Sequence, residues 1–263
     1  MATGLLPVLP QGANVDSGFY AACAGLRAQS QALEVAGHNL ANLNTAGFRG
    51  QQTTFQSLMA VSGPTVPNVL NLATNNFGVL EGTRLDMTAG NLQATGNPLD
   101  VGIGGSGFFS IWTARGIRYT RNGSFQVSSS GQLVTAAGDL VLGDPALKDK
   151  GGISIPAGDV SIASDGTISV NGAVAGSIQL VEFAAGTKLT SEGGTLIAAP
   201  EGSAKPAQQP ALKQGALEAS NVNSIGSVVT LIGVQRQAEM LQRAMSLFDT
   251  EFNHIASSEL AKV

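Results

Sequence analysis

The chain has 263 residues, a net charge of −4 and a charged fraction of 12%, about half the share of an average soluble protein. Lysine and arginine are scattered without a basic run, which argues against a nucleic-acid partner. The single cysteine, Cys23, excludes an intramolecular disulfide, and no apolar run is long enough to predict membrane insertion. Low charge combined with 34 glycines favours β-structure and extensive subunit contact over a freely soluble enzyme.

Residues 1–16 form an N-terminal extension that is interrupted by Pro7 and Pro10. The extension lacks the basic segment of a secretory signal peptide. We therefore expect that, if the protein leaves the cytoplasm, it does so without a cleaved signal.

A helix is predicted over residues 17–44, with Asp16 or Ser17 as its N-cap and Ala46-Gly47 as its stop. Four apolar residues recur at intervals of seven, which is the period of a helix that packs lengthwise on another helix: Phe19, Leu26, Leu33 and Leu40. The only charges in this segment are Arg27 and Glu34. Such a helix suits either the core of a large monomer or a subunit whose terminal helices pack among copies of themselves.

The middle of the chain is predicted to be an extended connector over 45–91, with a possible short helix near 54–61, followed by a β-rich domain over 92–185. Asn-Gly and Asp-Gly pairs allow the positive φ of two-residue hairpin turns. Antiparallel hairpins are predicted at Asn122-Gly123, Ser130-Gly131, Ala137-Gly138, Asp165-Gly166 and Asn171-Gly172. Residues 186–215 are rich in glycine, proline and glutamine, and are predicted to be a return linker.

A second long helix is predicted from about residue 222 to 258, capped by Ser220 or Asn221. Its heptad positions include Leu231, Val234, Leu241, Met245, Phe248, Phe252 and Ile255. The simplest arrangement pairs residues 17–44 with 216–263 as a coiled coil. The predicted fold class is α+β, mostly β, with an antiparallel β-rich domain inserted between the terminal helices.

The sequence predicts no catalytic, cofactor or metal site. Residues 102–107 match G-x-G-x-x-G, but a strand pattern follows where a dinucleotide site requires a helix, so we interpret the glycines as a close approach of two strands. The two histidines, His38 and His254, have no second ligand at helical spacing.

Three groups of residues, in the same order along the chain, resemble the signatures of bacterial flagellar rod and hook proteins. The first group is Asn39, Leu40, Ala41, Asn42, Gly47 and Phe48. The second is Gly96, Asn97, Pro98, Leu99 and Asp100, and the third is Ser220, Asn221, Val222 and Asn223. Hairpin sequences similar to those of the family lie at 119–125 and 131–135, so the resemblance covers most of the chain.

The resemblance implies a non-enzymatic axial subunit of the flagellar basal body, the periplasmic rod. Its partners would be copies of itself, other rod and hook subunits, and the flagellar type III export apparatus. The length resembles the rod proteins more than the hook protein, and the proximal rod subunit is favoured over the distal one. A secreted β-rich adhesin and a glycan- or nucleotide-acting enzyme are the alternatives from other classes. The adhesin does not explain heptads at both ends, and no paired carboxylates indicate the enzyme.

Overall fold

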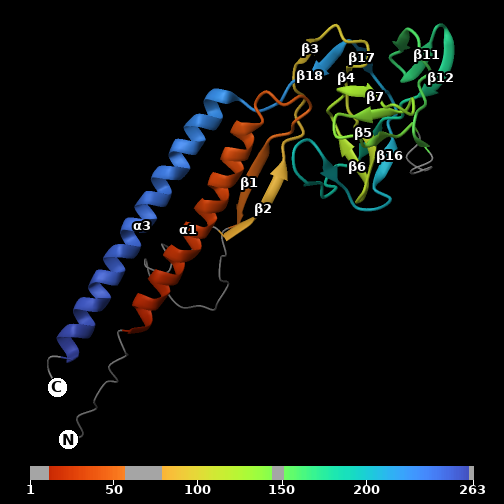
Figure 1. Cartoon of the computed structure of the whole chain (residues 1–263). Helices are drawn as coiled ribbons and strands as arrows, with labels where there is room; N and C mark the ends of the chain where they lie inside the picture. Colours follow the sequence, from red (N-terminus) through yellow and green to blue (C-terminus); the bar gives the residue numbers. More distant parts are fainter. Residues whose placement is uncertain (1–11, 57–78, 144–150, 261–263) are drawn as a thin grey trace, which may run out of the picture. The chain divides into compact units, whose positions relative to one another are not determined.

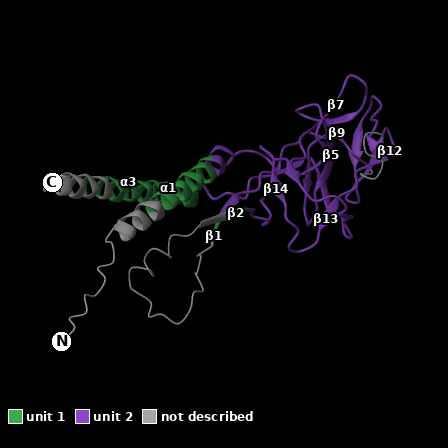
Figure 2. Ribbon diagram, turned by 90° about the horizontal axis from the view of Figure 1, so that it is seen from below, with its two compact units in different colours: residues 1–37, 53–83, 225–263 green, residues 38–52, 84–224 purple. Residues whose placement is uncertain are grey.

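The computed structural model describes residues 12–56, 79–143 and 151–260, which fall into two compact units. Unit 1 takes its described residues from 12–37, 53–83 and 225–260, and unit 2 comprises 38–52 and the described residues of 84–224 (Figure 2). The fold is α+β and mostly strand, as predicted. Among the described residues, no helix combines the length and apolar character that crossing a membrane requires.

Unit 1 contains the two long helices, which lie side by side (Figure 1). Helix α1 spans Gly12–Ala41, so it begins before the predicted cap at Asp16 or Ser17. Its buried residues are small and three or four residues apart: Ala22, Gly25, Ala28, Ala32 and Ala36. Small residues on one helical face allow another element to approach closely. Of the predicted leucine row, Leu33 is 39% exposed, whereas Leu26 and Leu40 are half-buried.

Helix α3 spans Ser224–Leu260, 37 residues or roughly 55 Å. Within the part of the helix whose side chains are described, half-buried residues recur at the predicted heptad spacing: Leu231, Val234, Ala238, Leu241 and Met245. None of the described side chains of α3 is fully buried, and several apolar ones are exposed: Ile225, Val229, Ile232, Met240 and Leu247. Phe19, Phe248, Phe252 and Ile255 lie on the helices where side chains are not described.

The predicted cap of α3 is wrong, because the helix begins two residues beyond Val222. Ser220 instead accepts a hydrogen bond from the Val222 amide through its Oγ atom, at 3.3 Å. The Asn221 side chain bonds the distant backbone of Gly50 and Asp86 rather than the first turn of the helix.

Two strands, β1 (Gln51–Gln56) and β2 (Val79–Leu85), form a two-stranded sheet in the segment predicted to be an extended connector. Residues 54–56 of the possible short helix belong to β1, and the rest of that helix lies outside the described residues.

Unit 2 is built around a seven-stranded sheet with the order β14-β15-β6-β5-β9-β8-β7. In chain order its strands are β5 (Phe109–Thr113), β6 (Gly116–Thr120), β7 (Phe125–Val127), β8 (Leu133–Thr135), β9 (Leu140–Val141), β14 (Thr190–Ser191) and β15 (Ile197–Ala198). A three-stranded sheet contains β10 (Val160–Ile162), β11 (Thr167–Val170) and β12 (Ala173–Ser177). All of these strand pairs are antiparallel.

Three two-stranded ladders connect distant parts of unit 2. They pair β3 (Leu92–Ala94) with β18 (Ala216–Glu218), β4 (Val101–Ile103) with β17 (Leu212–Gln214), and β13 (Val181–Phe183) with β16 (Ala204–Pro206). The main core cluster brings together apolar side chains of both larger sheets and β4, including Val101, Ile103, Phe109, Ile111, Phe125, Leu133, Ile168 and Val170.

Four of the five predicted hairpin turns are confirmed. Ser130-Gly131, Ala137-Gly138, Asp165-Gly166 and Asn171-Gly172 each join neighbouring antiparallel strands. Asn171 and Gly172 have φ values of 50° and 83°, as a turn with two left-handed residues requires. Asn122-Gly123 is not a hairpin turn, because β6 and β7 lie far apart in the sheet order.

The stretch predicted to be a return linker, 186–215, differs from that expectation because it contains β14 to β17. These strands have two or three residues each, too few to produce an alternating pattern in the sequence. The close approach of two strands that was predicted at the glycines of 102–107 is found at Gly102. A Cβ added there would lie 2.5 Å from a Leu92 methyl carbon.

The strand pairings predict that unit 2 needs its C-terminal residues in order to fold. A fragment of residues 38–224 should unfold cooperatively on heating, whereas a fragment of 38–212 should lose its sharp transition. The shorter fragment lacks β18 and most of β17, and leaves β3 and β4 without their partners. Thermal unfolding followed by circular dichroism measures the difference, and equal midpoints for the two fragments would contradict the prediction.

Candidate functional site: a buried ionic clasp

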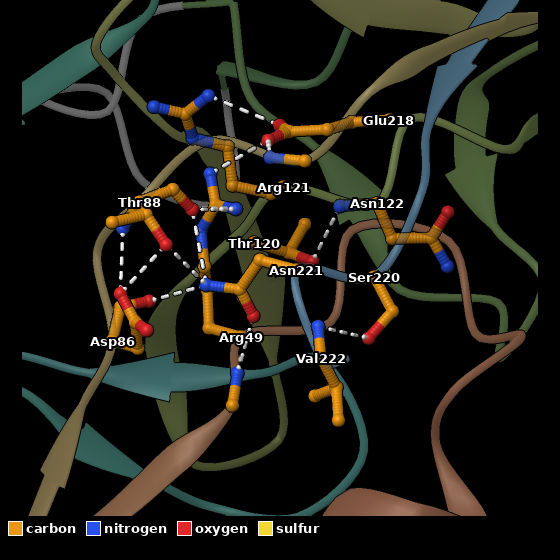
Figure 3. Close-up of polar contacts among 12 residues, drawn as sticks. Arg49, Asp86, Thr88, Thr120, Arg121, Asn122, Glu218, Ser220, Asn221 and Val222 are labelled. Atoms are coloured by element: carbon orange, nitrogen blue, oxygen red, sulfur yellow. Dashed lines mark hydrogen bonds and ion pairs between the residues drawn. The ribbon is translucent and has the colours of Figure 1, made fainter. Parts of the chain in front are cut away.

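Three charged side chains from distant parts of the chain meet inside unit 2 (Figure 3). Arg49 Nη2 donates to Glu218 Oε1 at 2.8 Å, and Arg121 Nη1 donates to Glu218 Oε2 at 3.0 Å. The side chains of Arg49, Arg121 and Glu218 are 1%, 5% and 0% exposed. We call these three residues the ionic clasp, because they join segments 169 and 97 residues apart.

Backbone groups add two further hydrogen bonds to the clasp. Gly90 N donates to Glu218 Oε1 at 2.7 Å, and Arg49 Nη1 donates to the Thr88 carbonyl oxygen at 2.7 Å. The Arg121 guanidinium lies over the Phe108 ring, 5.1 Å from its centroid, in cation–π geometry. These contacts position both guanidinium groups around one carboxylate.

The clasp holds two positive charges and one negative charge. Burial lowers the pKa of Arg121 below its usual value, with Glu218 acting against this shift and Arg49 adding to it. Within the described part of the chain, the Nε atoms of Arg49 and Arg121 are buried without a hydrogen-bond partner. A buried ion pair is costly to desolvate, so the clasp depends on having all three of its members.

Two glycines let the backbone close around the clasp. Gly47 N donates to the Glu218 carbonyl oxygen at 2.7 Å, and its φ of 68° is left-handed. A Cβ at Gly47 would overlap the backbone nitrogen of Asn122, and a Cβ at Gly90 would overlap the carbonyl oxygen of Ala219. Glycine is therefore required at both positions by close approach, and at Gly47 also by conformation.

Two asparagine side chains tie the same segments together through the backbone. Asn221 Oδ1 accepts from Gly50 N at 2.7 Å, while its Nδ2 donates to the carbonyl oxygens of Asp86 and Thr88 at 2.9 and 3.0 Å. The Asn39 side chain makes two bonds of 2.8 Å to the Gln51 backbone, one in each direction. Each side-chain amide thus both donates to and accepts from the backbone, as a neighbouring β-strand would.

Asp86 anchors the turn that carries Thr88. Its Oδ1 accepts hydrogen bonds from Thr88 N at 2.9 Å and from Thr88 Oγ1 at 2.7 Å, and its Oδ2 accepts from Gln52 Nε2 at 3.1 Å. Burial acts to raise the pKa of Asp86, but these hydrogen bonds outweigh it and hold the pKa below its usual value.

The second predicted signature forms a separate turn. Asn97 Nδ2 donates to Asp100 Oδ1 at 3.1 Å, Gly96 adopts a φ of 76°, and Gly215 N donates to the Asp100 carbonyl oxygen at 2.8 Å. Pro98 and Leu99 lie within this turn, which packs beside the junction of β17 and β18.

Several predicted signature residues meet at the clasp and others do not. Asn39, Gly47 and Asn221 contact it directly or through one backbone segment, and Phe48 is buried with its ring 5.3 Å from that of His38. Leu40 and Ala41 are the last residues of α1, and Asn42 follows the helix, where its Nδ2 donates to the His38 carbonyl oxygen. Val222 and Asn223 precede α3.

Arg49, Arg121, Glu218 and Gly90 are absent from the residues predicted to be functional. One signal in the sequence could have pointed to Arg49, Arg121 and Glu218. Charged residues are scarce in this chain, and these three lie within or next to the segments that resemble the family signatures. In the described ranges, no group of three or more histidine, cysteine or acidic residues could hold a metal ion. The arrangement joins and orients backbone segments.

Comparison with known proteins connects the clasp to three family models. A model described as "Flagella basal body rod protein" matches residues 19–49, and one described as "Flagellar hook protein FlgE/F/G D1 domain" matches 102–170. A third, "Flagellar basal body rod FlgEFG protein C-terminal", matches 213–251. Each clasp residue therefore comes from a different matched segment.

Similar proteins include the flagellar basal-body rod protein FlgG of Buchnera aphidicola, 33% identical over 86% of this chain and 93% of the relative. FlgG of Bacillus subtilis is 34% identical over 83% of this chain and 89% of its own length. FlgF of Escherichia coli is 32% identical over 89% of this chain and 95% of its own length.

The clasp predicts that Glu218→Gln lowers the free energy of unfolding of the purified protein by about 3–5 kcal/mol, because two buried guanidinium groups lose their counter-ion. Denaturant unfolding measures this change. Glu192→Gln is the control, since Glu192 also pairs with two arginines, Arg115 and Arg118, but these are 62% and 17% exposed and Glu192 is 24% exposed. An ion pair that solvent reaches contributes less than a fully buried one. Equal effects of the two substitutions would show that the clasp does not stabilise the fold.

The close backbone approach predicts that Gly47→Ala is more destabilising than Gly138→Ala. Both glycines have left-handed φ values, 68° and 87°, so both variants carry the same conformational strain of about 1–3 kcal/mol. Only at Gly47 would the new methyl group overlap a backbone atom, since nothing lies within 4 Å of a Cβ at Gly138. Thermal midpoints of the two variants measure the difference, and similar midpoints would contradict the prediction.

Proposed function

The chain belongs to the flagellar basal-body rod protein family, and from this premise we propose that it is a proximal, FlgF-like rod subunit that polymerises through its terminal helices. As a member of that family it is a structural protein of the flagellum and not an enzyme. The observation that carries the proposal is the combination of a closed, clasped unit 2 with an α3 helix that has no buried side chain in its described part.

The proximal assignment has the distal, FlgG-like subunit as its alternative. Relatives of both names match this chain at 32% and 33% identity over similar lengths, so overall similarity does not separate them. The proximal assignment rests on Ala238, which stands in the half-buried row of α3. The larger aromatic side chain often found at this position among the resembling rod and hook proteins is absent here.

Polymerisation through the helices is supported by the two faces of α3. The half-buried heptad row that includes Leu231 and Leu241 suits a coiled-coil seam with α1. The opposite face carries Ile225, Ile232, Met240 and Leu247, which are 46–77% exposed. Large exposed apolar patches mark interaction sites, so we propose that neighbouring subunits cover this face. In this arrangement the helices form the inner layer of the rod and the inserted β-rich unit its outer layer.

Assembly of this kind also explains how the helices become stable. Ordering a residue costs about 1–2 kcal/mol of backbone entropy, and helix α3 buries little apolar surface to offset this cost. We propose that the helices order on assembly. We further propose that the chain passes through the flagellar export apparatus without a cleaved signal and resides in the periplasmic rod.

The experiment places an epitope tag between Asn171 and Gly172, at the β11–β12 turn, and locates it on purified basal bodies by immunogold electron microscopy. The expected label lies at the proximal part of the rod, whereas label at the distal part would favour the alternative. Met240→Asp should remove the label without changing the thermal midpoint of the purified protein, because Met240 is 61% exposed.

The matched control is Val127→Asp, which introduces the same charge at a 41% exposed valine of unit 2. This variant should still enter the basal body. Normal incorporation of the Met240→Asp chain would contradict assembly through the exposed face of α3 that carries Met240. Absence of label from wild-type basal bodies would overturn the proposed function itself.

A further inference from the structure

A cleft of about 350 Å³ in unit 2 opens beside the ionic clasp. Its lining residues come from four segments and include Met87, Ala89, Ser106, Phe108, Arg121 and Glu182. We call it the Arg121 cleft, because Arg121 is the one clasp residue that lines it. Neither Arg49 nor Glu218 contributes to its wall.

Arg121 is incompletely neutralised where it meets the cleft. One terminal nitrogen donates to Glu218, while the other points away from that carboxylate (Figure 3). Its Nε atom is buried without a partner, and the side chain is 5% exposed. The single carboxylate of the clasp is shared with Arg49, so one positive charge of the cluster has no counter-ion within the clasp.

Glu182 also lines the cleft but makes a different contact. Its Oε1 accepts a hydrogen bond from Ser106 Oγ at 2.7 Å. In the part of the chain that the structure describes, the ion pairs of Arg121 include Glu218 and not Glu182. Glu182 is therefore the internal group that competes with any outside anion for Arg121, and its removal should favour that anion.

The walls of the cleft indicate what kind of anion it accepts. Phe108 and Phe183 supply aromatic surface, and Gly105 and Gly107 leave one wall without side chains, so another backbone can approach closely. At the rim, Met87 is 44% exposed and Ala89 is exposed, which gives apolar surface for a partner to cover. A free inorganic ion would leave this apolar rim uncovered.

We propose that the Arg121 cleft is a socket for an acidic side chain of a neighbouring rod subunit. A carboxylate matches the planar donor edge of a guanidinium, and a charge-assisted hydrogen bond in a shielded cleft is stronger than one in water. The partner's aspartate or glutamate supplies the second negative charge of the clasp, and the backbone around it packs on Met87 and the glycine wall. This inference rests on the proposed function, because it takes the neighbour to be a flagellar subunit.

The first test supplies the missing carboxylate from the chain itself. Ala89→Glu places an acidic side chain at the rim of the cleft, with Ala89→Gln as its uncharged isosteric control. The glutamate variant of the purified full chain should unfold several degrees above the glutamine variant. The same pair of substitutions at Val174, which is 73% exposed on β12, should show no such difference.

Equal midpoints for Ala89→Glu and Ala89→Gln would overturn the socket, because the clasp would then have no unmet charge. Adding Glu182→Gln to both variants should widen their difference, because the competing carboxylate is removed. A difference that shrinks or disappears would overturn the socket, since the carboxylate introduced at position 89 would then not be acting on Arg121. These measurements use the isolated protein, so they fail or succeed independently of the proposed function.

The second test identifies the occupant in purified basal bodies. A photoreactive amino acid in place of Met87 should cross-link to a peptide of an adjacent flagellar subunit that contains aspartate or glutamate, and Ala89→Glu should greatly reduce the yield. Cross-linking that is unchanged by Ala89→Glu, or that reaches only peptides without an acidic residue, would overturn the assignment of an acidic neighbour.

Discussion

The rest of unit 2 depends on the ion pairs and hydrogen bonds that the Glu218 carboxylate makes. This carboxylate is fully buried, it accepts hydrogen bonds from two arginines and one backbone amide, and these donors belong to segments far apart in the chain. A buried ion pair contributes little net stability compared with an apolar substitute, but losing one partner is strongly destabilising. The clasp therefore acts chiefly by disfavouring any arrangement in which the three segments are not together. The strand β18 that carries Glu218 is held in register with β3 by the same requirement.

The clasp also determines where the chain enters and leaves unit 2. The segment after α1 passes through Gly47 and Arg49, and the segment before α3 passes through Glu218 and Asn221. Close backbone contacts at Gly47 and Gly90, together with the two asparagine side chains, bring these segments within hydrogen-bonding distance of each other. The segment that follows α1 and the segment that precedes α3 are thus joined within unit 2 by a single buried network. A change at Glu218 would act on both connections at once.

The features that could be predicted from the sequence are those encoded within a few residues. Heptad spacing located both helices, and four glycine-containing pairs located hairpins, because both signals depend on local geometry. Asn122-Gly123 failed because the same dipeptide was bound by the backbone of a distant strand, with Val101 N donating to Gly123 O at 3.0 Å. The strands of 186–215 were missed because several of their partners lie far away in the sequence, as when β17 pairs with β4 and β15 with β6. The clasp was missed for the same reason, since no local pattern relates Arg49 to Glu218.

Sparse charge has opposite consequences in the two units. In unit 2, a few charges are concentrated in the interior, where one carboxylate serves two guanidinium groups and Arg121 remains partly unmatched. In unit 1, the exposed face of α3 leaves apolar side chains such as Ile232 and Met240 in solvent, interspersed with charged side chains such as Arg236. Each unit therefore leaves a different requirement unmet within one chain, negative charge in one and apolar cover in the other. In the proposed rod, every neighbour would present a helix face and an acidic side chain at fixed positions, and these would meet both requirements. On this view the low charge content of the chain reflects the fraction of its surface that is covered on assembly.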